Sequence, residues 1–123
     1  MFPKFMAKIM SVASTEVLST TRRLLLEQQG HSVCSALSLA DVEALAKTEK
    51  VDLALIGHGF RGPEKREIAR AVHQYYPDLP ILEMCHHSPE IHDADFVFSD
   101  APADLIRAVT DILEGRRVRG FAE

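Results

Sequence analysis

The sequence of 123 residues has no tryptophan, two cysteines and no long run of apolar residues. Cys34 and Cys85 are too few for a disulfide scaffold, and they lack the Cys-x-x-Cys spacing of a structural zinc site. The apolar runs fall short of the ~20 residues that cross a bilayer, and the first residues lack the apolar core of a secretory signal. We therefore expect a cytoplasmic protein with two free thiols and no membrane contact.

An excess of positive charge is missing as well. Fourteen Lys and Arg residues stand against eighteen Asp and Glu residues, so the net charge is -4 and the pI is near 5.8. The chain has no overall positive field for a phosphate backbone, which argues against nucleic acid as a direct partner. The hydrophobic fraction of 46% and the charged fraction of 26% are average for a globular protein, and the length suits one domain.

What the sequence does contain is an alternation of short apolar runs with segments of helical periodicity. Five apolar runs predict strands at residues 8–13, 32–37, 51–56, 80–85 and 96–99. The run at 51–56 is nearly all apolar, as expected for a central strand covered on both faces. Short strands joined by helical crossovers predict a doubly wound α/β fold with a five-stranded parallel sheet.

Capping residues mark the ends of the predicted helices. Ser14 or Thr15 is expected to cap the first helix, Gly30 to close it, and Pro63 and Pro102 to open two later helices. On the first helix, the buried stripe is expected to contain Val17, Leu18, Thr21, Leu24 and Leu25. Two histidines, His31 and His73, are expected to face solvent.

The order of these elements and several of their phrases resemble the receiver domain of bacterial response regulators. The phrases are Lys8–Val12, Asp52–Gly57, Pro80–Met84 and Ala94–Phe98, within a likeness that spans about residues 7–115. The resemblance implies a chemotaxis-type, flavodoxin-like sheet with strand order 2-1-3-4-5 and three α/β/α layers. In such sheets the working residues lie just beyond the carboxyl ends of the strands.

The resemblance also implies phosphorylation of an aspartate after the third strand, with two acidic residues after the first strand holding Mg²⁺. At the matching positions this sequence has Ala13 and Ser14 for the acidic pair, Gly57 for the phosphoacceptor, Cys85 for the hydroxyl residue of the fourth strand and Asp100 for the lysine of the fifth. Mg²⁺ needs carboxylate oxygens, and phosphoryl transfer needs both the metal and a nucleophile. The sequence therefore predicts a degenerate receiver without phosphorylation chemistry.

A second departure concerns the segment between the last two strands. Cys85 and Asp93 are eight positions apart, whereas the family fits a whole helix between these points. We therefore expect the fourth helix to be shortened or missing, which leaves the face of strands four and five beside the last helix open to a partner or to a second copy.

The alternative interpretation is a metal or small-ligand sensor at the same rim of the sheet. The candidate ligands are His58, Cys85, His86 and His87, with His92 and Asp100 nearby. Imidazole and thiolate together suit Zn²⁺ or copper. Against this, neighbouring strand residues point apart and the spacing matches no known ligand pattern, so we favour solvated histidines and a buried, apolar Cys85.

Two further patterns at this rim are set aside. Gly57, Gly59 and Gly62 fit the Gly-x-Gly-x-x-Gly fingerprint of dinucleotide sites, but they follow the third strand and Pro63 removes one helix amide, so a flexible turn is favoured. Cys85 beside a histidine is also disfavoured as a nucleophile, because sequence neighbours on a strand rarely reach each other.

Charged residues at two other places need partners. Glu83 interrupts an apolar strand and is expected to pair with Lys or Arg or to be exposed through the missing helix; the functional alternative is a subunit contact. Arg116, Arg117 and Arg119 are interpreted as a solvated tail rather than as an anion or partner contact.

Together these patterns predict a stand-alone receiver-like domain over residues 1–123, with its core at about 7–115 and no effector domain. We expect no enzymatic activity, no cofactor and no metal. The expected partner is a signalling protein, with a homodimer through strand four, strand five and the last helix as one form of that contact.

Overall fold

The computed structural model describes residues 6–98 and 100–120, which form a five-stranded parallel sheet with the strand order β2-β1-β3-β4-β5. The strands are β1 (Lys8–Val12), β2 (Ser32–Ala36), β3 (Leu53–Ile56), β4 (Ile81–Met84) and β5 (Asp95–Val97). The helices are α1 (Glu16–Gln28), α2 (Leu39–Ala46), α3 (Gly62–Tyr75) and α4 (Pro102–Leu113). This confirms the predicted doubly wound architecture and strand order.

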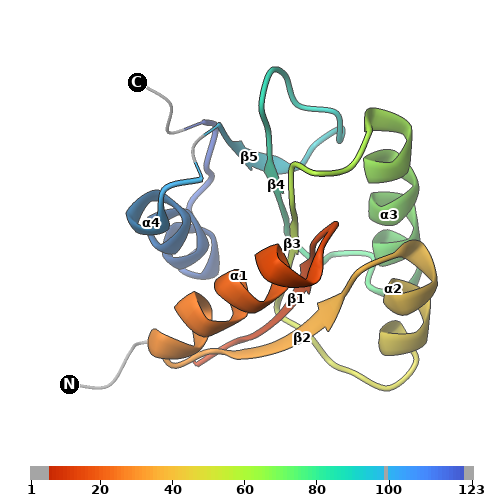
Figure 1. Ribbon diagram of the computed structural model, residues 1–123, viewed down its shortest axis with the longest axis horizontal. Helices are drawn as coiled ribbons and strands as arrows, with labels where there is room; N and C mark the ends of the chain where they lie inside the picture. Colours follow the sequence, from red (N-terminus) through yellow and green to blue (C-terminus); the bar gives the residue numbers. More distant parts are fainter. Residues whose placement is uncertain (1–5, 99, 121–123) are drawn as a thin grey trace.

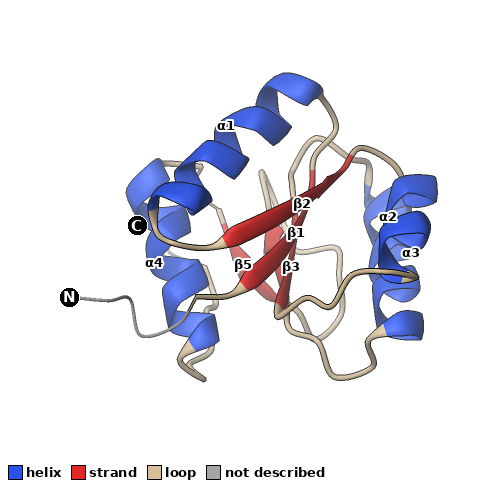
Figure 2. Ribbon diagram, turned by 90° about the horizontal axis from the view of Figure 1, so that it is seen from below, coloured by secondary structure: helices blue, strands red, loops and turns tan. Residues whose placement is uncertain are grey.

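The sheet separates two layers of helices. Figure 1 shows α1 and α4 on one side and α2 and α3 on the other, and the turned view in Figure 2 shows the same two pairs. Each layer packs its own buried apolar cluster against the sheet, with Met10, Ile56 and Val72 on the α2 and α3 side and Leu26, Leu55 and Val109 on the α1 and α4 side. All four residues of β3 are buried, as expected of the central strand.

Local sequence explains most helix ends. Thr15 caps α1 by accepting a hydrogen bond from the Leu18 amide, and Ser38 caps α2 through the Asp41 amide. Gly30 and Gly115 follow α1 and α4 with φ angles of 95° and 88°, a conformation that glycine adopts without a steric penalty. Helix α3 begins at Gly62, one residue before the predicted Pro63.

The predicted buried stripe of α1 was wrong at three of its five positions, whereas Leu18 and Leu25 are half-buried and Leu25 packs against the apolar cluster. Val17 and Leu24 are 75% and 50% exposed and Thr21 is exposed, whereas the buried residues are Ser19, Arg22 and Leu26. The apolar positions were assigned to the core because of their type, but one of the three inward positions of this helix carries an arginine. That side chain reaches the carboxyl end of the sheet.

The segment between β4 and β5, residues 85–94, contains no helix, which confirms the expected loss of the fourth helix. Ile91 and Ala94 of this loop are buried and join the cluster under α3. The loop therefore covers part of the sheet face that a helix would have covered.

The arginine tail was interpreted as solvated, and Arg116, Arg117 and Arg119 are indeed exposed, but the backbone of residues 116–120 packs along the outer edge of β5. The Phe96 amide donates to the Val118 carbonyl, the Gly120 amide donates to the Phe96 carbonyl, and Val118 is 1% exposed. Asp95 accepts hydrogen bonds from the Arg117 side chain at 2.9 Å and from the Val118 amide at 2.7 Å. The packed part of the chain thus extends beyond Gly115 to Gly120.

His31 was expected in solvent but is buried, and its Nδ1 accepts a hydrogen bond from the Ala7 amide at 3.2 Å. Burial lowers the pKa of His31 below its ordinary value of 6.5. The unfolded chain therefore binds more protons than the folded chain as the pH falls below 6.5, so His31 makes the protein less stable in acid.

We expect the urea midpoint of the wild type to be lower at pH 5.5 than at pH 7.5. This decrease should be smaller in His31→Gln, because the glutamine amide oxygen can accept the same hydrogen bond without titrating. His92→Gln, which replaces an imidazole that is 95% exposed, is the matched control. Its urea midpoint should change with pH as much as that of the wild type does. An equal change of urea midpoint with pH in all three proteins would contradict this role of His31.

Candidate functional site

The candidate site lies at the carboxyl ends of β1 and β3, where the strand order changes direction. Ala13, Ser14 and Gly57 follow these two strands, and Cys85 follows β4. Ala13 is fully buried and its amide donates to the Ala36 carbonyl, while the Gly57 amide donates to the Val12 carbonyl. The positions singled out in the sequence are therefore brought to one edge of the sheet, but none of these four carries a carboxylate.

Arg22 is the residue of this site that sequence reasoning missed. Arg22 lies on the inner face of α1 and is 5% exposed. Its guanidinium lies directly over Gly57. A Cβ atom at Gly57 would lie 2.4 Å from Nη1 and 3.3 Å from Cζ of Arg22. The arginine thus fills the space of a residue 57 side chain, so any side chain at position 57 has to displace it.

The buried guanidinium is incompletely satisfied. Nη1 of Arg22 has no hydrogen-bond partner among residues 6–98 and 100–120. Burial lowers the pKa of Arg22, and the Asp100 carboxylate opposes that shift. Mg²⁺ does not fit this arrangement, because the acidic pair is replaced by Ala13 and Ser14 and a fixed cation already lies at the end of β3.

The three glycines of the turn after β3 are each approached closely by a side chain of the same chain. Cβ atoms at Gly59 and Gly62 would lie 2.0 Å from Ser14 Oγ and 2.6 Å from Glu90 Oε1, as the one at Gly57 would meet Arg22. The close approach that glycine allows here serves internal packing, which favours the turn interpretation over a pyrophosphate site.

Two of the histidines meet at this rim. The ring centroids of His58 and His86 are 4.2 Å apart, and His58 Nε2 lies 3.9 Å from Asp100 Oδ2. Burial lowers the pKa of His58, and the neighbouring His86 and Arg22 lower it further, while Asp100 opposes them. His87 is more distant, with its ring centroid 6.2 Å from that of His86.

Cys85, which follows β4, is a buried thiol. It is 2% exposed, and burial together with the Glu83 carboxylate raises the pKa of its thiol to about 12. A thiol with this pKa is protonated at neutral pH and is neither a good nucleophile nor a ready ligand. Both cysteines are free thiols, and the described ranges 6–98 and 100–120 hold no group of three or more His, Cys, Asp or Glu residues placed to bind a metal.

Glu83 pairs with Lys65 inside the fold. It is fully buried, and its Oε2 accepts a hydrogen bond from Lys65 Nζ at 2.9 Å. Its carboxylate also accepts from the amides of Glu90 and Ile91 at 3.0–3.1 Å, while Lys65 Nζ donates to the Met84 carbonyl at 2.7 Å. The predicted pairing is confirmed, and exposure through the missing helix was wrong, because Glu83 holds the loop that replaces that helix.

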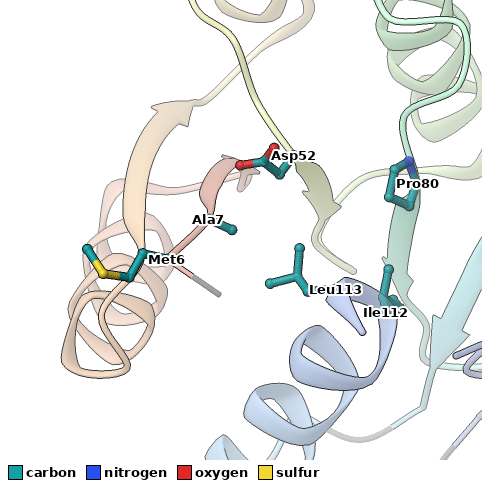
Figure 3. Close-up of a pocket in the computed structure, with 6 residues that line it drawn as sticks. All are labelled: Met6, Ala7, Asp52, Pro80, Ile112 and Leu113. Carbon is teal, nitrogen blue, oxygen red and sulfur yellow. The ribbon is translucent and has the colours of Figure 1, made fainter. Parts of the chain in front are cut away.

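A cavity of about 420 Å³ lies at the opposite end of the sheet, between the amino ends of the strands and the end of α4. Figure 3 shows its lining residues, Met6, Ala7, Asp52, Pro80, Ile112 and Leu113. The carboxylate in this lining, that of Asp52, accepts a hydrogen bond from the Lys8 amide at 2.9 Å. Its polar group is thus engaged in the β1–β3 pairing, and we assign no function to this cavity.

Among the described residues, no helix is long and apolar enough to cross a membrane. No protein-family model and no curated protein matches the sequence.

Solved structures do match it. A two-component response regulator of the LuxR family from Aurantimonas sp. SI85-9A1 is 26% identical, with a TM-score of 0.77 over 93% of this chain and 89% of that one. A CheY-like receiver domain protein from Methanospirillum hungatei JF-1 is 18% identical, with a TM-score of 0.76 over 89% of this chain and 95% of that one. A receiver protein from Sinorhizobium medicae WSM419 is 21% identical, with a TM-score of 0.74 over 89% and 96%. The chain therefore has the receiver-domain fold of two-component response regulators.

Proposed function

We propose that this chain is a pseudo-receiver, which keeps the receiver scaffold but acts in two-component-type signalling through protein contacts instead of aspartyl phosphorylation. The observation that carries the proposal is the end of β3. Gly57 offers no carboxylate there, and the guanidinium of Arg22 fills the place of a side chain. Without a nucleophile at this position, the acyl phosphate of an active receiver has no atom on which to form.

The charges around Gly57 support the same proposal. Ala13 and Ser14 supply no carboxylate pair for Mg²⁺, and Asp100 puts a negative charge where the family has a lysine. The buried cation of Arg22 further disfavours a divalent cation by direct repulsion. On these grounds we propose a protein that is not an enzyme and takes no cofactor.

The surface that we propose for the partner is the face of β4, β5 and α4 with the loop of residues 85–94. A cavity of about 430 Å³ beside β5, on the α3 side of the sheet, adjoins this surface and is lined by Pro89, Glu90, Ile91, His92, Asp93, Ala94, Phe96 and Arg119. Phe96 is only partly buried, because no helix covers β5 on this side. A second copy of the chain is one candidate partner, and the two free thiols suit a cytoplasmic, reducing setting.

The proposal is tested by incubating the purified protein with acetyl phosphate and Mg²⁺ and recording its intact mass, with light scattering on the same samples. We expect no phosphoryl increment and no change in mass in solution, because the rim lacks both the nucleophile and the metal ligands. An intact receiver with its aspartate serves as the positive control. A phosphoryl increment on this chain under conditions that modify the control would refute the proposal.

A further inference from the structure

We propose that the chain forms a two-fold symmetric dimer through the outer edge of β2, which pairs antiparallel with β2 of a second copy and joins the two sheets into one. This contact lies at the opposite edge of the sheet from β5. It is therefore separate from the surface of β4, β5 and α4, and it does not depend on the loss of phosphorylation.

The two edges of the sheet differ in how they end. The edge of β5 is covered by the tail, since Phe96 exchanges backbone hydrogen bonds with Val118 and Gly120. At the other margin, shown in Figure 1, no described strand lies beyond β2. The strand Ser32–Ala36 has no charged residue and no proline, and its register with β1 runs without a bulge. Charges, prolines and bulges are the features that keep an edge strand from pairing, so β2 is open to a further strand.

The backbone of β2 turns alternate residues toward that edge. The Ser32 amide donates to the Ala7 carbonyl at 2.9 Å, and in a parallel ladder every second residue bonds to the same neighbouring strand. The backbone groups of Ser32 and Cys34 therefore face β1. Those of Val33 and Ser35 point outward, where a further strand would bond to them.

The free stretch of this edge is short and symmetric. The next outward amides on either side are already used, because His31 donates to the Leu26 carbonyl at 3.3 Å and Leu37 donates to Asp41 Oδ2 at 2.9 Å. What is left is residues 33–35, centred on Cys34. A stretch that is symmetric about one residue matches its own copy turned by a two-fold axis, which is the arrangement of an isologous dimer.

Antiparallel pairing about this centre uses every outward group. Val33 of each copy lies opposite Ser35 of the other, and each of these pairs exchanges two backbone hydrogen bonds. Cys34 lies opposite Cys34 of the second copy in a pair without hydrogen bonds, with the two Cα atoms about 4.5 Å apart. Because the tail covers the edge of β5, the assembly closes at two copies and does not grow into a longer sheet.

The charges that act on Cys34 are balanced. Burial raises the pKa of its thiol, and beside this effect Lys8 lowers that pKa while Glu49 raises it. Lys8 and Glu49 form an ion pair with each other. Two copies of a chain with a net charge of -4 therefore meet at this strand without an unpaired like charge beside Cys34.

The test is sedimentation equilibrium of the whole chain with a reducing agent, from micromolar to millimolar concentration, since a contact this small gives a dimer that dissociates on dilution. Ser35→Pro removes the outward amide and should raise the dissociation constant of the dimer at least about tenfold. Ser35→Ala keeps that amide and is the matched control, with the dissociation constant of the wild type. A wild type that stays monomeric throughout, or equal dissociation constants in the two variants, would overturn the inference.

Oxidation of the wild type tests the register without any variant in the strand. Diamide takes two electrons and two protons from a pair of thiols, which become a disulfide while diamide is reduced to its hydrazine. Cα atoms about 4.5 Å apart allow this bond, so Cys34 should link the two copies. Cys34→Ser should lose the linked dimer and Cys85→Ser, at a buried thiol, should keep it.

The outcomes separate this inference from the proposed function. A wild type that sediments as a dimer but forms no disulfide through Cys34 would place the contact elsewhere and overturn the β2 pairing, whatever the result with acetyl phosphate. A phosphoryl increment in the mass test would refute the pseudo-receiver and leave the β2 dimer in place.

Discussion

Replacing Glu83 with alanine is expected to lower the free energy of unfolding by about 3 to 5 kcal/mol, because it leaves a buried ammonium group without its counter-charge. Lys65 Nζ would keep only its bond to the Met84 carbonyl, and the amides of Glu90 and Ile91 would lose their acceptor. The measurement is equilibrium unfolding in urea, followed by a signal from the whole chain. The loop of residues 85–94 should also become sensitive to proteases, since Glu83 is its main attachment.

Two variants control this experiment. Glu90→Ala removes an exposed ion pair between this loop and Arg66 and should cost at most about 1 kcal/mol. The double variant Lys65→Met with Glu83→Leu removes both charges and should recover much of the loss, as apolar replacements of buried pairs often do. If Glu83→Ala were no worse than Glu90→Ala, the buried pair would not hold the loop.

Ending the chain after Gly115 is the second change expected to have a large effect, about 3 to 5 kcal/mol of stability. It removes the buried Val118 side chain, the two backbone hydrogen bonds to Phe96 and the partners of the buried Asp95 carboxylate. The outer edge of β5 would then present unpaired backbone groups, so the shortened protein should also self-associate. Urea unfolding and light scattering measure the two effects.

A chain that ends after Gly120 keeps every one of these contacts and is the matched control. It should have the urea midpoint and the oligomeric state of the 123-residue chain. Equal stability of the chain ending at Gly115 and the chain ending at Gly120 would show that the tail contributes nothing to the fold.

Periodicity and capping residues predicted the strands, the sheet and most helix ends, because these depend on short-range patterns, whereas the strand order was implied by the resemblance to receiver domains. Ser38 with Asp41, Pro102 and the four apolar residues of β3 are examples in which local sequence and tertiary packing agree. The loss of the fourth helix could also be predicted, since chain length between two strands limits what fits between them.

The site was predicted only in part. The residues that match the family's site positions could be read from the resemblance, but Arg22 lies ten residues beyond β1 in sequence, on a helix whose apolar residues suggested a different inner face. Its position depends on the length of the arginine side chain and on the space left by Gly57 across the sheet edge. The docked tail was missed for a similar reason: Val118 is a single apolar residue between arginines, without a periodic pattern to mark it.

The contact between Arg22 and Gly57 has a consequence for the history of this chain. An aspartate restored at position 57 would arrive against a guanidinium that already fills its space, and a smaller residue restored at position 22 would face an end of β3 that still lacks an acid. Neither replacement alone re-creates a phosphoacceptor with a metal beside it, and Ala13, Ser14 and Asp100 would have to change too. Under the proposed function, a return to phosphorylation therefore needs several substitutions together, because each single substitution gives a protein that still lacks the complete phosphorylation site.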